Sequence, residues 1–295
     1  MSLFTGSAVA IVTPFLGEGI HYDLFESLIE WHIQEGTQAI IVAGSTGEGV
    51  TLSQIEKLTL FERAVSVAAA RVPIIANVGS NDTAKSITLA KAAKRLGVDG
   101  LLAVTPYYNK PNQAGMKAHF EALANAVDCP IILYNVPSRT GVNLEANTLA
   151  ELAKHPNIVG VKEAAGDLEQ VTAYRKLTSK DFMIYSGNDD LYFESLKRGA
   201  NGVISVAANI EPRKTQALYE AFQTDQTAAK AIQAALDRLN DVLYLAPNPV
   251  PIKAALAYQG VPTEAVRLPL VPLSEEEANQ LYVVLDTVKP VVNLP

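Results

Sequence analysis

Residues 95–104 read RLGVDGLLAV, and this stretch shows the unit from which the whole chain is built. A helical pattern ends at Gly97, where a left-handed C-cap is useful, and a short apolar strand follows directly. The segments QEGTQAIIV and KRGANGVIS repeat this arrangement around Gly36 and Gly199. The chain is therefore predicted to alternate between helices and strands.

Eight short apolar runs carry this alternation along the chain. They are AVAIV from residue 8, AIIVA from 39, PIIANV from 73, GLLAVT from 100, PIILY from 130, IVGVK from 158, FMIYS from 182 and GVIS from 202. Helical spacing lies between them, and Ser53 with Glu56, like Ser274 with Glu277, fits a capping box at a helix start.

Strands that are apolar on both faces and recur in eight βα units favour a closed parallel barrel. We predict a (β/α)8 TIM barrel over residues 1–224, followed by a small C-terminal helical region over residues 225–295. An open doubly wound sheet is the competing fold, but it would usually carry a nucleotide signature after its first strand. No such glycine pattern follows AVAIVTPF.

Composition limits the possible partners and the compartment. The net charge is −7 over 295 residues with scattered basic side chains, which argues against nucleic acid or an anionic membrane as partner. Cys129 is the only cysteine, so neither an internal disulfide nor a cysteine metal cluster is expected, and a cytoplasmic location is the simplest expectation. The four histidines show no metal spacing, and no P-loop or dinucleotide motif occurs, so neither a metal nor a cofactor is expected.

Polar residues follow the predicted strands, at the end of the barrel where such folds build their active sites. They are Thr13, the loop 44–48, the segment 105–108, Tyr134, Lys162, Ser186 and Gly187. Together they describe a pocket with hydroxyl groups, phenols and one amine.

Lys162 ends the apolar run IVGVK and is the first candidate for chemistry. Burying an ammonium is costly, so a lysine at the end of a buried strand either reaches water or acts as an uncharged nucleophile. Strand alternation places Gly160 on the same side as Lys162 and the two valines of the run on the other side. The lysine should then point into the barrel, beside a glycine that leaves room for a substrate, where apolar neighbours would disfavour the charged form. We therefore predict a Schiff-base lysine.

Other groups are expected near this amine. Tyr134 closes the preceding strand, and its phenol could move protons during imine formation, with Thr46 and Tyr108 extending a hydroxyl chain. The loop GSTGEG presents backbone N–H groups that can hold a carboxylate, and the planar fork of Arg139 could hold another. Taken alone, the glycine pattern is a weak signal, because such turns are common for steric reasons, and a solvated loop arginine explains Arg139 equally well.

The motifs in this order resemble the class I, pyruvate-dependent aldolases, the family typified by dihydrodipicolinate synthase and N-acetylneuraminate lyase. The landmarks are TPF at 13, GSTGEG at 44, TPYYNKP at 105, YNVPSRTG at 134, VGVKEAAGD at 159, YSGND at 185 and NPVPIKAAL at 248. They span nearly the whole chain, and several long motifs in one order are a specific signal.

The resemblance implies a lyase in which Lys162 forms an imine with pyruvate. It implies a proton relay of Tyr134, Thr46 or Ser45, and Tyr108, and it suggests that Tyr108 is donated across a subunit interface. A homodimer at least, and by resemblance a homotetramer, is therefore expected.

Substrate contacts follow from the same resemblance. The Ser45–Thr46 backbone and Ile204 are expected to contact pyruvate, and Gly187 to line the substrate site. Arg139 looks like the dihydrodipicolinate synthase version of the motif, because neuraminate lyases typically lack this arginine. It implies L-aspartate 4-semialdehyde as second substrate and 4-hydroxy-tetrahydrodipicolinate as product, on the diaminopimelate route to lysine.

Two positions depart from the family pattern. The synthases usually have threonine where this chain has Ser45, and serine keeps the hydroxyl but loses the methyl group that restricts its rotation. Lysine-inhibited relatives tend to have histidine and glutamate at the positions of Lys57 and Lys85. A cationic side chain repels a cationic effector, so weak or absent feedback inhibition by lysine is expected.

Two other functions fit the same residues. One is a pyruvate-dependent sugar-acid aldolase, such as an N-acetylneuraminate or 2-keto-3-deoxygluconate lyase, which would use the same imine with a larger aldehyde. The other is a barrel that binds a metabolite as a sensor or scaffold without turnover, against which Lys162, Tyr134 and Thr46 argue.

Overall fold

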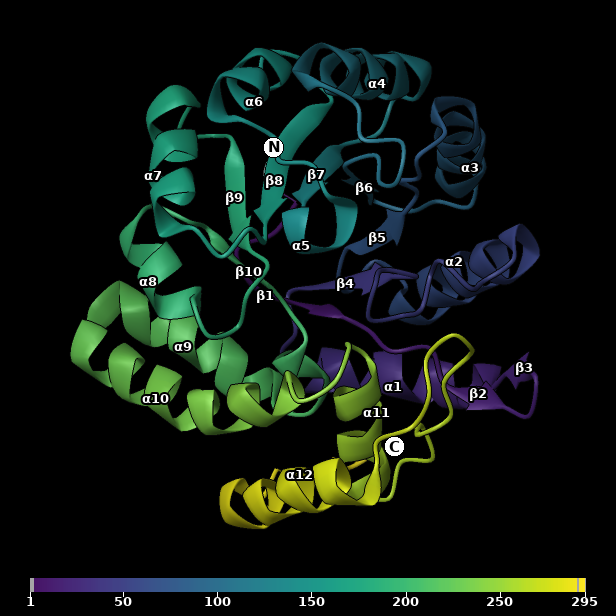
Figure 1. The fold of residues 1–295 in the computed structure, drawn as a ribbon, viewed down its shortest axis with the longest axis vertical. Helices are drawn as coiled ribbons and strands as arrows, with labels where there is room; N and C mark the ends of the chain where they lie inside the picture. The colour runs from purple at the N-terminus through teal and green to yellow at the C-terminus, as the bar shows by residue number, and fades with distance from the viewer. Residues whose placement is uncertain (1–2, 291, 295) are drawn as a thin grey trace.

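The computed structural model describes residues 3–290 and 292–294, and its centre is a closed barrel of parallel strands (Figure 1). The strands are β1 (Gly6–Ala10), β4 (Ala39–Val42), β5 (Ile74–Asn77), β6 (Gly100–Val104), β7 (Ile131–Asn135), β8 (Ile158–Glu163), β9 (Met183–Ser186) and β10 (Gly202–Ser205). They follow one another around the barrel in chain order, and β1 closes it by pairing with β10 and β4. The predicted TIM barrel is confirmed.

Helices surround the barrel and form its outer layer (Figure 1). They are α1 (Tyr22–Gln34), α2 (Gln54–Ala68), α3 (Thr83–Arg95), α4 (Gln113–Ala126), α6 (Ala146–Leu152), α7 (Leu168–Leu177), α8 (Tyr192–Lys197) and α9 (Pro212–Thr224). The predicted glycines after α1, α3 and α8 have positive φ angles of 83°, 89° and 90°, and α2 begins with the predicted capping box. Local sequence therefore sets where these helices begin and end.

Alternation along the strands divides the core into two layers. Side chains that point inward, such as Ile41, Leu102 and Ile132, fill the barrel, while those that point outward, such as Leu133 and Val161, pack beneath the helices. All of these residues are almost completely buried. The inward-pointing side chains of these described residues thus fill the barrel interior as a packed core, and folds of this kind build their active sites at the carboxyl ends of the strands.

The strand that carries Lys162 departs from the predicted alternation. Ile131 pairs with Ile158, but the next residue, Ile132, pairs with Gly160, so the register shifts by one residue at Val159. Val159 packs against the inward-pointing side chains that fill the barrel, whereas the alternation predicted it on the outer face with Val161. A β-bulge of this kind re-aims the side chains that follow it.

Gly160 also has a different role from the one predicted. A Cβ atom at this position would lie 2.7 Å from the carbonyl oxygen of Met183, so the neighbouring backbone of β9 excludes any side chain there. Gly160 is required by strand packing and is not among the residues that line the cavities described below.

The C-terminal part of the chain returns to the open end of the barrel. Helix α10 (Gln226–Leu243) packs against α9, and α11 (Val250–Tyr258) and α12 (Glu275–Val288) follow, with the second predicted capping box at the start of α12. The segment between α11 and α12 runs beside the small hairpin of β2 (Phe15–Leu16) and β3 (Gly19–Ile20) (Figure 1). Over the described residues, no helix combines the length and apolarity that crossing a membrane requires.

Candidate active site

Lys162 and Tyr134 lie side by side at the carboxyl ends of β8 and β7. The two residues are register partners, and the Lys162 Nζ lies 4.5 Å from the centre of the Tyr134 ring. Their exposed fractions are 6% and 7%, and both line a cavity of about 410 Å³. The amine is therefore held inside the barrel mouth and does not project into bulk solvent.

Gly187 packs directly against the Lys162 side chain. A Cβ atom at Gly187 would lie 2.9 Å from Lys162 Cε and 2.6 Å from Ala164 Cβ. Any larger residue would push the lysine stem aside, so glycine here keeps the amine in place. Gly187 also lines the cavity, as predicted from its place after β9.

The GSTGEG loop forms the next wall of the site. Ala43 and Glu48 have left-handed backbones with φ of 56° and 53°, and a Cβ at Gly49 would lie 2.0 Å from the Ala43 carbonyl oxygen. This tight turn places Ser45 and Thr46 at the cavity, where Thr46 Oγ1 accepts a hydrogen bond of 3.0 Å from Asn248 Nδ2. Strained backbone of this kind is typical of sites that hold a ligand.

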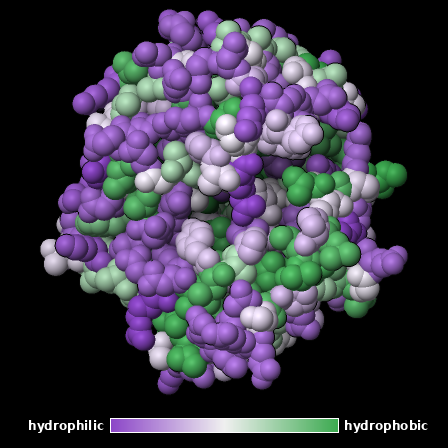
Figure 2. All heavy atoms as spheres, viewed as in Figure 1, coloured by the Kyte–Doolittle hydropathy of each residue, from purple (hydrophilic) through white to green (hydrophobic). Residues whose placement is uncertain are grey.

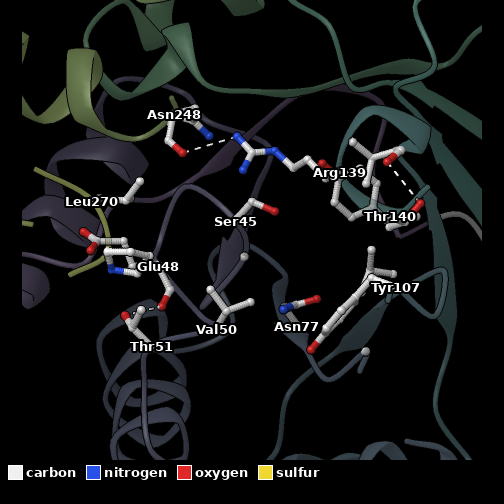
Figure 3. Close-up of a pocket in the computed structure, with 16 residues that line it drawn as sticks. Ser45, Glu48, Val50, Thr51, Asn77, Tyr107, Arg139, Thr140, Asn248 and Leu270 are labelled. Atoms are coloured by element: carbon white, nitrogen blue, oxygen red, sulfur yellow. Dashed lines mark hydrogen bonds between the residues drawn. The ribbon is translucent and has the colours of Figure 1, made fainter. Parts of the chain in front are cut away.

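Arg139 stands at the mouth, on the short helix α5 (Pro137–Thr140). Its side chain lines both the Lys162 cavity and an adjoining one, and Nη2 donates to the Asn248 carbonyl over 3.3 Å. Figure 3 shows the Arg139 side chain reaching toward Asn248, with Ser45 just below the two and with Asn77 and Tyr107 farther down in the view. The guanidinium is partly in solvent, where it can receive an incoming anion.

Part of the wall comes from residues for which no role was predicted. Tyr244 and Asn248 line the Lys162 cavity, and Pro269 and Leu270 line the adjoining one. Asn248 belongs to the motif NPVPIKAAL, so the sequence contained a signal, but its spacing did not connect the motif to the pocket. The C-terminal region therefore contributes directly to the site.

A buried ion pair joins this region to the GSTGEG loop. Lys253 Nζ lies 2.7 Å from Glu48 Oε1, and the two side chains are 0% and 1% exposed. Lys253 also donates to the Thr13 carbonyl over 2.9 Å, and the backbone N–H of Arg267 donates to Glu48 Oε2 over 2.9 Å. Burial lowers the pKa of Lys253, while the neighbouring Glu48 carboxylate raises it. Both oxygens of Glu48 are thus held by residues from the end of the chain.

Two predicted residues lie away from the cavities. Tyr108 is 88% exposed with a φ of 71°, and the residue that lines the adjoining cavity is its neighbour Tyr107. Ile204 is fully buried in the inner cluster, where it pairs with Ala8, and is not among the cavity residues. The roles predicted for Tyr108 and Ile204 stay predictions.

The groups that converge here suit carbonyl chemistry. An amine, a phenol and hydroxyl groups surround one cavity, and a guanidinium stands at its entrance, which is the set required to form an imine and to orient acidic reactants. Among the described residues, no group of three or more His, Cys, Asp or Glu side chains could hold a metal ion.

Comparisons with known proteins agree over nearly the full length. Residues 3–288 match the model of the dihydrodipicolinate synthetase family. Curated relatives named 4-hydroxy-tetrahydrodipicolinate synthase include one from Thermoanaerobacter sp., 46% identical over 97% of each chain, and one from Exiguobacterium sibiricum, 46% identical over 98% of this chain and 100% of the relative.

Solved structures give the same result. The chloride-inhibited dihydrodipicolinate synthase from Acinetobacter baumannii complexed with pyruvate is 42% identical, with a TM-score of 0.96 over 98% of this chain and 100% of that one. The enzyme from Cyanidioschyzon merolae with lysine bound is 41% identical, with a TM-score of 0.96 over 98% of this chain and 99% of that one.

Proposed function

This chain belongs to the dihydrodipicolinate synthetase family, and we propose that it is a lyase that condenses pyruvate with L-aspartate 4-semialdehyde to 4-hydroxy-tetrahydrodipicolinate. The observation that carries the proposal is the buried Lys162 amine beside Tyr134, in a cavity that Arg139 also lines. The relatives' shared name and the pyruvate complex of the neighbour from Acinetobacter baumannii support the reaction and its first substrate.

The reaction begins when the Lys162 nitrogen attacks the keto carbon of pyruvate. Proton transfers through the Tyr134 phenol convert the carbonyl oxygen into water, which leaves as the C=N bond forms. The imine then loses a proton from the methyl group and becomes an enamine. Tyr134 suits this task because its ring lies against the amine, so that a nitrogen-bound intermediate stays beside the phenol.

The second half joins the two substrates. The enamine carbon attacks the aldehyde carbon, whose oxygen takes up a proton, and the imine re-forms on Lys162. The amino group of the added fragment then attacks the imine carbon, and the bond to Lys162 breaks as the ring closes. In this proposal Arg139 holds the carboxylate of the semialdehyde through its planar fork.

The carboxylate of pyruvate requires a separate contact. We assign it to the backbone at Ser45 and Thr46, because the tight turn aims this segment at the Lys162 cavity. Thr46 also takes part in the proton relay with Tyr134, and Asn248 orients its hydroxyl. Ile204 is proposed to contact the condensing pyruvate, from the core layer beneath.

A second copy of the chain completes the relay in this proposal. Tyr108 is 88% exposed on a left-handed backbone, and the large apolar side chains of Val50, Ile55 and Leu268 are 80%, 78% and 79% exposed. Figure 2 shows apolar side chains gathered beside a hollow at this end of the molecule. We propose that a partner subunit covers this surface, inserts its own copy of Tyr108, and so forms at least a homodimer and by family resemblance a homotetramer.

Reduction with borohydride tests the imine. Incubation with pyruvate and borohydride should add the mass of a reduced pyruvate adduct to the wild-type chain, and Lys162→Ala should abolish this adduct. Lys180→Ala, at an exposed lysine, is the matched control and should leave the adduct intact. A silent wild-type trap would instead favour a barrel that binds a metabolite without turnover.

Turnover with different aldehydes tests the second substrate. Arg139→Ala should weaken use of the semialdehyde far more than imine formation, and Arg139→Lys should restore only part of the loss because it lacks the planar fork. Equal loss of both steps would contradict the role given to Arg139. Turnover of a sugar-derived aldehyde in place of the semialdehyde would identify a sugar-acid aldolase.

The cysteine content bears on the cellular compartment in which the protein works. With one buried cysteine, the chain has no need of an oxidising environment, and we propose that it works in the cytoplasm. We propose no metal ion or organic cofactor, because the amine itself supplies the covalent chemistry.

A further inference from the structure

We infer that Glu163 is a positioning residue that, with Asn135, joins the ends of β8 and β7 behind the active site and so fixes the Lys162 amine against Tyr134. The inference rests on the proposed function, because it takes Lys162 as the amine that forms the imine. Glu163 is not among the residues that line either cavity.

The position of the pair follows from the strand register. Asn135 comes directly after Tyr134, Glu163 directly after Lys162, and each pair of residues is in register across β7 and β8. Since neighbours on a strand point to opposite faces, Asn135 and Glu163 lie on the outer face while the two reactive side chains point inward. Their exposed fractions of 0% and 4% show that helices cover them.

Three N–H groups converge on the Glu163 carboxylate. Asn135 Nδ2 and Gln170 Nε2 donate to Oε2 over 2.9 and 2.8 Å, and the backbone N–H of Ala165 donates to Oε1 over 2.6 Å. Asn135 is fixed in orientation because its Oδ1 accepts a hydrogen bond of 2.9 Å from the backbone N–H of Leu144. The bond between the two strands therefore has one defined donor and one defined acceptor.

The same residues reach the active site through their backbones. The Glu163 carbonyl accepts from the backbone N–H of Gly187 over 2.7 Å, and Gly187 packs against the Lys162 stem. The Asn135 carbonyl accepts from the backbone N–H of Ala164 over 2.9 Å. The ends of β7, β8 and β9 are thus tied together around the amine.

Barrel stability alone does not explain an acid at this place. The outward-facing residues just below, Leu133 and Val161, are apolar and fully buried, and an apolar residue at 163 would avoid desolvation of a charge. Burial raises the pKa of Glu163, whereas the hydrogen bond from Asn135 lowers it. The Glu163 carboxylate is costly to bury and its hydrogen bonds are directional. Its place next to Lys162 indicates that it serves to hold this reactive lysine in one position.

Glu163→Gln replaces the carboxylate with an amide of almost the same shape, which cannot accept all three of these N–H groups. If the new amide oxygen stays with Ala165, its NH2 group faces the NH2 group of Asn135, and Asn135 cannot turn because Leu144 holds it. The opposite orientation sets the new NH2 group against the Ala165 N–H. The first orientation loses the bonds from Asn135 and Gln170, and the second loses the bond from Ala165, so neither keeps the full set. At saturating pyruvate we expect the rate of borohydride-trapped imine formation to fall about tenfold, because small displacements of a reacting group are costly, with KM changed less than about twofold.

Two further variants separate positioning from general support. Asn135→Asp with Glu163→Gln exchanges donor and acceptor, so that the new amide on β8 donates to the new carboxylate on β7, and it should restore most of the rate. Gln170→Ala removes a donor from the same oxygen but leaves the bond between the strands, so it should keep a near wild-type rate. All rates are compared at a temperature where circular dichroism shows each variant folded.

Several results would overturn the inference. These are a wild-type rate in Glu163→Gln, an equal loss in Gln170→Ala, or no recovery in the double variant. If Glu163→Gln does not fold, Asn135→Ala cuts the bond between the strands from β7 and must slow trapping about tenfold. Absence of any adduct in the wild-type chain would refute the proposed function, whereas a trapped wild type beside an equally fast Glu163→Gln would refute only the role of Glu163.

Discussion

Replacing Lys253 with methionine should destabilise this protein through the buried pair that holds the GSTGEG loop. The Lys253 ammonium lies 2.7 Å from Glu48, and both side chains are essentially inaccessible to solvent. Methionine fills much of the same space but leaves the Glu48 carboxylate with the backbone N–H of Arg267 as its remaining partner in the cluster described above. The Thr13 carbonyl loses its hydrogen bond from Lys253 as well.

The magnitude follows from the cost of an unpaired buried charge. Removing one partner of a buried pair costs about 3–5 kcal/mol of unfolding free energy. With about 2.1 cal/mol/K of unfolding entropy per residue over 295 residues, this loss lowers the unfolding midpoint by roughly 5–8 °C. The effect should be the same at high and low salt, because a buried pair is screened far less than a surface pair.

Thermal unfolding followed by circular dichroism measures this loss, at one fixed protein concentration. The double variant Glu48→Gln with Lys253→Met is the matched control, because it removes both charges and should recover most of the midpoint. A single variant that melts within a degree of wild type would refute the reasoning. So would a double variant that melts as low as the single variant, since the unpaired charge could then not be the cause.

Three further predictions concern the site and its surroundings. Gly187→Ala should slow imine trapping about tenfold, because its Cβ would lie 2.9 Å from Lys162 Cε; an unchanged trapping rate would show that this contact does not place the amine. The hydrogen bond from Arg267 lowers the pKa of Glu56 from 4.5 to about 2, so this pair stabilises the fold above pH 4.5, and its contribution is lost as the pH falls toward 2. Between pH 4.5 and 2, urea titrations should therefore show a smaller loss of unfolding free energy for Glu56→Gln than for wild type. Equal losses in the two proteins would contradict the pairing. Free lysine should inhibit turnover weakly or not at all, and inhibition at micromolar lysine would overturn that expectation.

Much of the fold could be predicted because its signals are local. Eight apolar runs, the glycines after three helices and the capping boxes each depend on residues close together in the chain, and all are present in the structure. The register shift at Val159 could not be predicted, because it arises where β8 meets its neighbour. Strand periodicity describes one strand and is silent about pairing.

The candidate site, like the fold, could be predicted from the sequence only in part. The sequence alone placed Lys162, Tyr134 and the GSTGEG loop at the carboxyl ends of strands, since the end of a strand and the face of its last residue follow from local alternation. Glu163 carried a signal that was missed: an acid on the outward face of a barrel strand is out of place unless it has buried partners.

The amino-acid sequence by itself determined that this protein is a barrel with an amine at one strand end, because both depend on spacings of a few residues. Only the tertiary structure decided that residues from the end of the chain form a wall of the site, with Asn248 on Thr46 and Lys253 on Glu48, 202 and 205 positions apart. Contacts over such separations depend on how whole helices pack around the barrel. Local spacing carries no information about that packing, so these partners become visible only once the chain is folded.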